Sequence, residues 1–140
     1  MEPEEKTMND ARTLAGSDPV QRLLRRRAVD VLLDMTLRAC ARVMTDEAIG
    51  AVLVRGPRGP VGVLSERDIV AALAEGADAD RDRARDYMTA DVDGVPDQTT
   101  IADAGREMLR NEIRHLAVTR DGTTVGLISS RDVLAVLAVA

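Results

Sequence analysis

The chain is 140 residues long, with 45% hydrophobic and 31% charged residues, a net charge of −5 and one tyrosine as its sole aromatic residue. This size suits one domain whose core needs neither a disulfide nor a structural metal. The acidic balance and the scarcity of aromatic side chains disfavour nucleic acid as a partner, because phosphates attract basic surfaces and unpaired bases stack on aromatic rings.

The remaining composition indicates a cytoplasmic protein. Cys40 is the single cysteine and has no partner for an internal disulfide. No apolar run approaches the length of a membrane span, and the acidic start MEPEEK is the opposite of a positively charged signal-peptide start. We therefore expect a reducing compartment and no membrane partner.

Residues 1–19 are polar and mixed in charge, and we expect them to be poorly ordered. At their end, Asp18 followed by Pro19 is typical of a helix N-cap with proline at the first helical position. This pair predicts a short helix that extends through Leu23 and Leu24.

The first structured region is predicted to span residues 20–80. A short strand near 29–31 leads to a helix that begins after Thr36, because apolar residues then recur at helical spacing. Two extended runs, 51–54 and 61–65, flank the turn sequence GPRGP and predict a β-hairpin. A second helix is expected from Arg67 to about Glu75.

The region 81–140 repeats this pattern. VGVLSERD at 61–68 returns as VGLISSRD at 125–132, and the same offset of 64 residues aligns Thr36 with Thr100 and Met44 with Met108 without a gap. After a short helix around 83–88, we expect a strand near 94–95, a helix after Thr100, a hairpin around RDGT and a C-terminal helix from Arg131.

A fixed-period repeat indicates a supersecondary unit that cannot bury its apolar face alone. Each copy reads β-α-β-β-α, so the predicted fold class is α/β (α+β), with two pseudo-symmetric repeats packed as one module. The C-terminal DVLAVLAVA is apolar on nearly every side, more than one buried face requires. A helix that is hydrophobic all round needs cover on all sides.

The duplicated ending Ser-x-x-Asp has two interpretations. Ser65 with Asp68, and Ser129 with Asp132, open a helix and suit a capping box, in which the hydroxyl and the carboxylate satisfy free backbone N–H groups. A carboxylate can also accept two hydrogen bonds from a vicinal diol, and a hydroxyl at a helix start lies well for anionic oxygens. Both roles can coexist.

The sequence resembles a tandem pair of CBS domains, the nucleotide-sensing modules named after cystathionine β-synthase. The resemblance covers residues from about 20 to 140. It rests on the ending G-h-h-[ST]-x-R-D, present at 62–68 and 126–132, on the entry VPDQTT at 95–100 and on IRHLAV at 113–118. It implies two repeats that pack through their sheets, with clefts between them for adenosine-containing ligands such as AMP, ADP, ATP or S-adenosylmethionine. CBS pairs commonly associate as homodimers, so the resemblance and the apolar C-terminal helix together predict a homodimer built on the second helices of the repeats.

By this resemblance, Asp68 and Asp132 hold the ribose hydroxyls, and Ser65 and Ser129 lie beside the ribose or phosphate. Two neighbouring arginines could pair with phosphate, although arginine in a first helical turn is often a solvated surface group. These are Arg67 and Arg131.

The chain departs from the family pattern in the entry strand of each repeat. Where members often place a threonine toward the nucleotide, it has Asp30 in the first copy and Gly94 in the second. A carboxylate repels phosphate, whereas a glycine contributes only its backbone. We therefore expect a nucleotide to bind first at the cleft that uses Gly94, and the cleft with Asp30 to disfavour ATP.

The remaining reactive side chains favour structural roles. His115 has no second histidine for a metal site and suits a half-buried edge position, and Cys40 falls on the apolar face of its helix. The sequence contains no nucleophile–base set, metal cluster or glycine-rich phosphate loop, so we expect no enzyme activity and no required cofactor.

Two functions remain open at this point. The first is a stand-alone regulatory module that binds an adenosine-type ligand and signals to an unknown protein target. The alternative is a ligand-free dimeric interaction protein that keeps the CBS fold.

Overall fold

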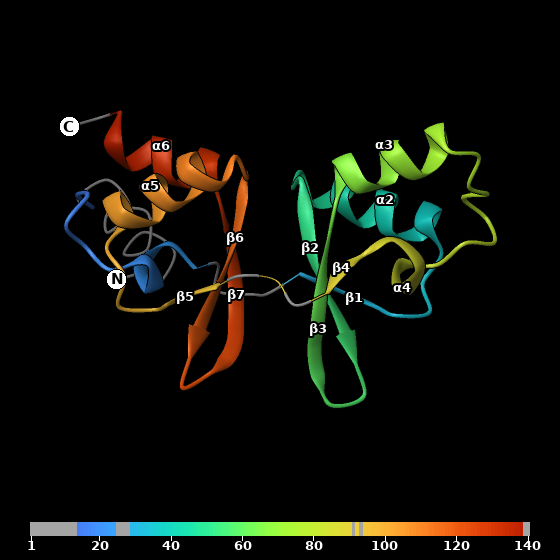
Figure 1. Ribbon diagram of the computed structural model, residues 1–140, viewed down its shortest axis with the longest axis horizontal. Coiled ribbons are helices and arrows are strands. Elements are labelled where there is room, and N and C mark those ends of the chain that lie inside the picture. The colour runs from blue at the N-terminus through green and yellow to red at the C-terminus, as the bar shows by residue number, and fades with distance from the viewer. Residues whose placement is uncertain (1–13, 25–28, 91, 93, 139–140) are drawn as a thin grey trace, which may run out of the picture. The chain divides into compact units, whose positions relative to one another are not determined.

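A computed structural model describes residues 14–24, 29–90, 92 and 94–138 (Figure 1). By their contacts the described residues form two compact units. Of the described residues, the first-repeat unit contains 29–90 and 92, and the second-repeat unit contains 94–138 together with 14–24. Most of the segment 1–19 that we expected to be poorly ordered lies outside the described residues.

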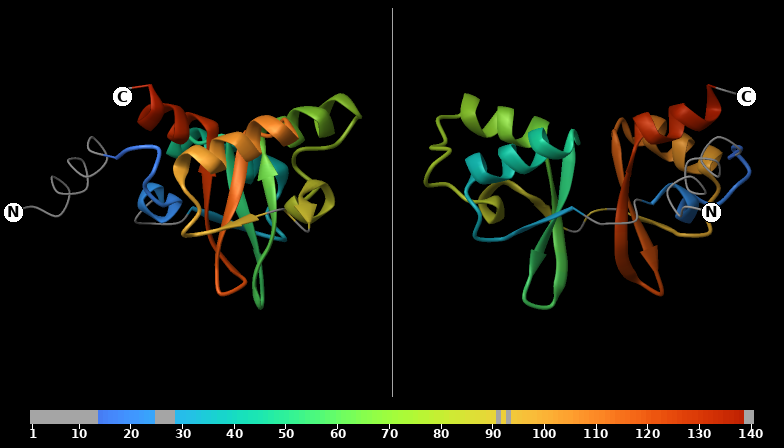
Figure 2. Two further views of the ribbon diagram at one scale, coloured as in Figure 1. Left: turned by 60° about the vertical axis from the view of Figure 1, so that its left-hand side comes forward. Right: turned by 180° about the vertical axis from the view of Figure 1, so that it is seen from behind.

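The first-repeat unit is a mixed sheet with helices on one face (Figure 2). Its strand order is β1-β2-β3-β4; β1 runs parallel to β2, and the other neighbours are antiparallel. The elements are β1 (Asp30–Leu32), α2 (Leu37–Glu47), β2 (Ala51–Gly56), β3 (Gly59–Ser65), α3 (Glu66–Ala74), α4 (Ala84–Tyr87) and β4 (Thr89–Ala90).

The second-repeat unit has the same design. Its sheet has the order β5-β6-β7, with a parallel and then an antiparallel pair. The elements are η1 (Val20–Leu23), β5 (Gly94–Pro96), α5 (Ile101–Asn111), β6 (His115–Arg120), β7 (Thr123–Ser129) and α6 (Ser130–Leu137). The predicted α+β class and the β-α-β-β-α order of each repeat are confirmed.

The helix starts follow the local sequence. The Thr36 hydroxyl accepts a hydrogen bond from Ala39 N at 3.2 Å, and the Thr100 hydroxyl accepts one from Asp103 N at 3.1 Å, so both predicted N-caps are present. Among the described residues, no helix is both long enough and apolar enough to cross a bilayer.

The prediction for Asp18 was wrong. Pro19 is the N-cap of η1, which is a 3₁₀ helix, and the Asp18 carboxylate instead accepts a hydrogen bond from Ala15 N at 2.8 Å. Asp18 also pairs with Arg22 at 3.2 Å. The carboxylate therefore stabilises the turn before the helix, and this turn keeps part of the predicted flexible segment packed on the unit, with Leu14 buried.

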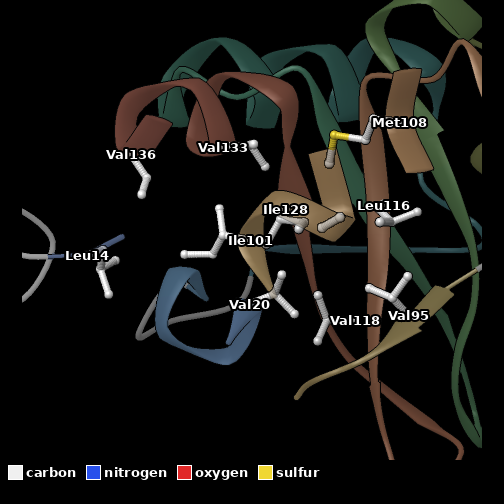
Figure 3. Packing of buried hydrophobic residues seen from close by; sticks show 11 residues of the cluster. Leu14, Val20, Val95, Ile101, Met108, Leu116, Val118, Ile128, Val133 and Val136 are labelled. Carbon is white, nitrogen blue, oxygen red and sulfur yellow. The ribbon is translucent and has the colours of Figure 1, made fainter. Parts of the chain in front are cut away.

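Each unit has its own aliphatic core. In the first-repeat unit, the inward faces of α2 and α3 pack on alternate residues of β2 and β3, with Cys40 fully buried as predicted. Burial raises the pKa of the Cys40 thiol to about 11, so it stays protonated and unreactive at neutral pH. Figure 3 shows the core of the second-repeat unit, where Val20 lies among side chains from β5 to α6.

The segment that leads into each repeat packs on the other repeat. Val20 N donates to Thr99 O at 2.8 Å, and Ala84 N, which lies 64 residues after Val20, donates to Met35 O at the same distance. Ile101 N donates to Asp18 O, and Leu37 N correspondingly donates to Asp82 O, each at 2.9 Å. Val20 and Ala84 are both fully buried. Each contact unit therefore differs from the predicted repeats 20–80 and 81–140: it contains the leading segment of the other repeat in place of its own. We call this the exchange of leading segments.

Glycine in the hairpin makes room for this exchange. An added Cβ on Gly126 would lie 2.6 Å from Leu24, and one on Gly62 would lie 2.7 Å from Thr89 O and 2.9 Å from the sulfur of Met88. Leu24 and Met88 are equivalent positions of the repeat. A side chain at Gly62 would meet the backbone of Thr89, so close packing of the exchanged segment favours glycine there, whereas a side chain at Gly126 would require only that the Leu24 side chain shift.

This packing predicts which unit a core substitution destabilises. Val20→Ala removes two buried methyl groups from the second-repeat unit and should lower its free energy of unfolding by about 2 kcal/mol. Hydrogen exchange should accelerate most at residues 115–129, whereas the matched substitution Val31→Ala should act most at residues 51–65. An unchanged unfolding free energy, or a Val20→Ala effect centred on residues 51–65, would contradict the exchange.

Candidate ligand-binding site

The first of the two motif copies forms a complete capping box at the start of α3. Asp68 N donates to the Ser65 hydroxyl at 3.1 Å, and Ser65 N donates to Oδ2 of Asp68 at 2.8 Å. Strand β3 ends at Ser65 and α3 begins at Glu66, so the box makes the sharp change from strand to helix.

The second copy has the same geometry at the start of α6. Asp132 N donates to the Ser129 hydroxyl at 3.1 Å, and Ser129 N donates to Oδ2 of Asp132 at 2.8 Å. The capping-box interpretation of both motifs is therefore confirmed. In each box only one carboxylate oxygen is used: no described residue donates a hydrogen bond to Oδ1 of Asp68 or Asp132.

Each carboxylate therefore retains hydrogen-bonding capacity beyond its structural role. Asp68 and Asp132 are half-buried, so Oδ1 lies at the margin of the protein on a side chain whose position is held by the cap. A held carboxylate oxygen can accept hydrogen bonds from hydroxyl groups without losing further side-chain freedom.

The flanking arginines lie at the surface. Arg67 and Arg131 are both exposed, each one residue before the aspartate of its box. Within the described residues neither has an ion pair. Their side chains can therefore pair with an anion from solvent, and their role as ligand contacts stays a prediction.

Asp30 is not the isolated charge that the sequence indicated. Its Oδ2 accepts from Arg55 Nε at 2.8 Å and lies 2.6 Å from Arg55 Nη2. The other oxygen, Oδ1, is buried and accepts no hydrogen bond from the described residues. The predicted repulsion of phosphate by Asp30 assumed an uncompensated charge, and the adjacent guanidinium offsets it.

Sequence analysis missed Arg55 because its partner lies on another strand. Asp30 is in register with Leu53 on the neighbouring parallel strand, so a side chain two residues further along β2 reaches it on the same sheet face. Knowing the pairing of β1 with β2 would have revealed the ion pair, since Asp30 and Arg55 are otherwise 25 residues apart.

The equivalent position in the second-repeat unit is crowded. An added Cβ on Gly94 would lie 3.1 Å from Ala117 O and 3.1 Å from Cγ2 of Thr119. Thr119, the equivalent of Arg55, donates its hydroxyl to Val95 O at 3.3 Å. A side chain at Gly94 would therefore require small shifts of Ala117 and Thr119 on β6. As a glycine, this position offers backbone groups only.

His115 is the first residue of β6, the middle strand of its sheet, and its side chain is half-buried as predicted. It lies directly opposite Ser129 in the β6–β7 register. Among the described residues, no group of three or more His, Cys, Asp or Glu side chains is arranged to hold a metal ion.

The comparison with known families matches this architecture. The model of the CBS domain family matches twice, at residues 20–75 and 84–139. The chain belongs to the CBS domain family. Both matches begin with the leading segment that packs on the other repeat, and both include the whole helix that follows the capping box.

Among curated CBS relatives, an uncharacterised 17.7 kDa protein of Acidianus ambivalens is 37% identical over 101 residues, which are 71% of this chain and 60% of the relative. An uncharacterised protein of Methanocaldococcus jannaschii is 27% identical over 88% of this chain and 44% of its own length. The chain thus spans between two fifths and two thirds of the length of these relatives.

Solved CBS structures agree over nearly the whole chain. A CBS domain protein of Pyrobaculum aerophilum, complexed with AMP, is 31% identical with a TM-score of 0.74, over 87% of this chain and 99% of that chain. A CBS-domain-containing protein of Agrobacterium tumefaciens is 30% identical with a TM-score of 0.77, over 84% of this chain and 92% of that chain.

The capping boxes predict a local stability contribution. Ser65→Ala and Ser129→Ala should each lower the unfolding free energy by about 1 kcal/mol, because each leaves a helix N–H without its acceptor. Chemical denaturation measures this loss. Ser130→Ala is a matched control in the same turn of α6, since its hydroxyl makes no hydrogen bond to the described residues. Equal effects of Ser129→Ala and Ser130→Ala would contradict the cap assignment.

Proposed function

We propose that this chain is a regulatory CBS pair that binds an adenosine-type ligand, drawn from AMP, ADP, ATP or S-adenosylmethionine, and communicates its occupancy to a partner protein. The observation that carries the proposal is the AMP complex of the Pyrobaculum aerophilum protein, which is 31% identical over 87% of this chain. A likeness this extensive makes an adenosine nucleotide the first ligand to test.

The described geometry supports a ribose contact by the capping-box aspartates. Asp68 and Asp132 each use Oδ2 for the cap and leave Oδ1 without a described donor. The two hydroxyl groups of a ribose are donors that such an oxygen can accept. The hydroxyls of Ser65 and Ser129 each accept one backbone N–H. Each hydroxyl can still donate its own hydrogen to a ligand oxygen.

A second observation favours protein association. On the outer sides of α3 and α6, Val70 is 66% exposed, Leu73 48%, Leu134 61% and Leu137 40%. Val70 is equivalent to Leu134 in the repeat, and Leu73 is equivalent to Leu137. Apolar side chains that are exposed at the same place in both copies indicate a surface that a partner covers. We propose a homodimer through these two helices.

Ligand binding can be tested without disturbing the caps. Asp68→Asn and Asp132→Asn keep a carbonyl oxygen for the serine N–H but replace the free acceptor by an NH₂ donor. Each should weaken AMP binding at its own unit by about tenfold or more, because a charge-assisted hydrogen bond is lost, while the ligand-free protein keeps its melting temperature within a few degrees. Isothermal titration calorimetry and thermal shift measure the two effects.

Asp103→Asn is the matched control for this experiment. Asp103 is exposed and occupies the same third helical position after a threonine cap in α5, outside the repeated motif. It should leave AMP binding unchanged. If the wild-type protein binds none of AMP, ADP, ATP and S-adenosylmethionine, the ligand-free interaction protein becomes the better account.

The homodimer is tested by sedimentation. At micromolar concentration the wild-type protein should sediment as a dimer, and the double substitution Val70→Glu with Leu134→Glu should give a monomer, because buried carboxylates at a helix interface are unpaired. Leu109→Glu on α5, where the side chain is 81% exposed, should remain dimeric. A wild-type monomer would contradict the proposal.

A further inference from the structure

The two capping boxes are surrounded by different neighbours. We call Gly50, Ala51, Ser65, Glu66 and Asp68 the α3 locus. Glu66 N donates to Gly50 O at 2.9 Å, and Ala51 lies opposite Ser65 in the β2–β3 register. These five residues are therefore contiguous around the start of α3.

The α6 locus consists of the equivalent residues Arg114, His115, Ser129, Ser130 and Asp132. Ser130 N donates to Arg114 O at 2.8 Å, and His115 lies opposite Ser129 in the β6–β7 register. The backbone around both loci is thus the same. Any difference in what they bind must come from side chains.

Three of the five side chains change between the loci. Gly50 is replaced by Arg114, Ala51 by His115 and Glu66 by Ser130. The arginine adds one positive charge and the loss of the glutamate removes one negative charge, so the α6 locus is more positive by two charges.

The other nearby charges do not cancel this difference. The serine and aspartate of the boxes are the same in both units, and Arg67 and Arg131 occupy equivalent positions. Asp30 forms an ion pair with Arg55, and its counterparts Gly94 and Thr119 are uncharged, so this pair of positions is formally neutral in both units. The imbalance therefore stays at the two helix starts.

We propose that the α6 locus takes the phosphate-bearing adenosine ligand, and that the α3 locus prefers an adenosine ligand without phosphate. This inference rests on the proposed function. A guanidinium matches phosphate oxygens in a bidentate manner, and the backbone N–H groups at a helix start favour an anion. At the α3 locus, the exposed carboxylate of Glu66 opposes a phosphate at the same place.

Three substitutions test this inference, and each changes the charge of one locus. Ser130→Glu gives α6 the first residue of α3, Glu66→Ser makes the reverse change, and Arg114→Gln removes the guanidinium but keeps the backbone carbonyl that holds Ser130 N. Arg110→Gln is the control for Arg114→Gln, because Arg110 is an exposed arginine on the preceding helix α5.

The probes are AMP and adenosine, titrated by calorimetry into the full chain and each variant. Ser130→Glu and Arg114→Gln should each weaken AMP binding about tenfold and change adenosine binding less than twofold. Glu66→Ser should strengthen AMP binding at the α3 locus several-fold. Asp132→Asn should remove the tighter AMP site, whereas Asp68→Asn should leave it.

The outcomes separate this inference from the function on which it rests. Equal changes for AMP and adenosine, or a tighter AMP site lost in Asp68→Asn and kept in Asp132→Asn, would overturn the charge-based preference alone. If neither probe binds the wild-type protein, this inference fails, whereas the proposed function fails only if ADP, ATP and S-adenosylmethionine do not bind either. An unchanged melting temperature of each ligand-free variant confirms that the fold was kept.

Discussion

Within each unit, backbone hydrogen bonds join the leading segment of one repeat to the strands and helices of the other repeat. Residues 18–21 bond to residues 97–101, and residues 82–85 bond to residues 33–37 at equivalent positions. These bonds place Val20 and Ala84 in the two cores and satisfy backbone groups at the starts of α5 and α2. A repeat cut out at its sequence boundaries would lose part of its own core, which explains why the repeat occurs as a pair.

The sequence predicted the helices and strands better than it predicted which segments contact one another. Apolar spacing and the threonine caps predicted α2 and α5, and the repeated hairpins predicted β2–β3 and β6–β7. These signals are local. The exchange of leading segments joins Val20 to Thr99, 79 residues away, and no periodicity specifies such a partner. The prediction that Asp18 is a helix N-cap was wrong because its carboxylate accepts a hydrogen bond from the preceding Ala15 N instead of from the helix that follows.

At the candidate site, too, local features could be predicted and contacts between strands could not. The Ser-x-x-Asp boxes lie within four consecutive residues, so their geometry followed from local sequence. The pairing of Asp30 with Arg55 depends on parallel strand register and changed the electrostatic argument for its unit. Crowding at Gly94 likewise arises from Ala117 and Thr119 on another strand.

The proposed second use of the capping aspartates, as ligand contacts, has a consequence for how a ligand would act. Because Oδ2 of Asp68 and of Asp132 is already committed to a helix cap, each Oδ1 is held in place before any ligand arrives. Such a site spends little conformational entropy on binding. A ligand that gains its contacts from a held group shifts an equilibrium only through its different affinity for two states. The proposed signalling would therefore require motion elsewhere than at the boxes. Helices α3 and α6 start at the boxes and carry the exposed apolar side chains, so they would connect the proposed ligand contacts to the proposed partner surface.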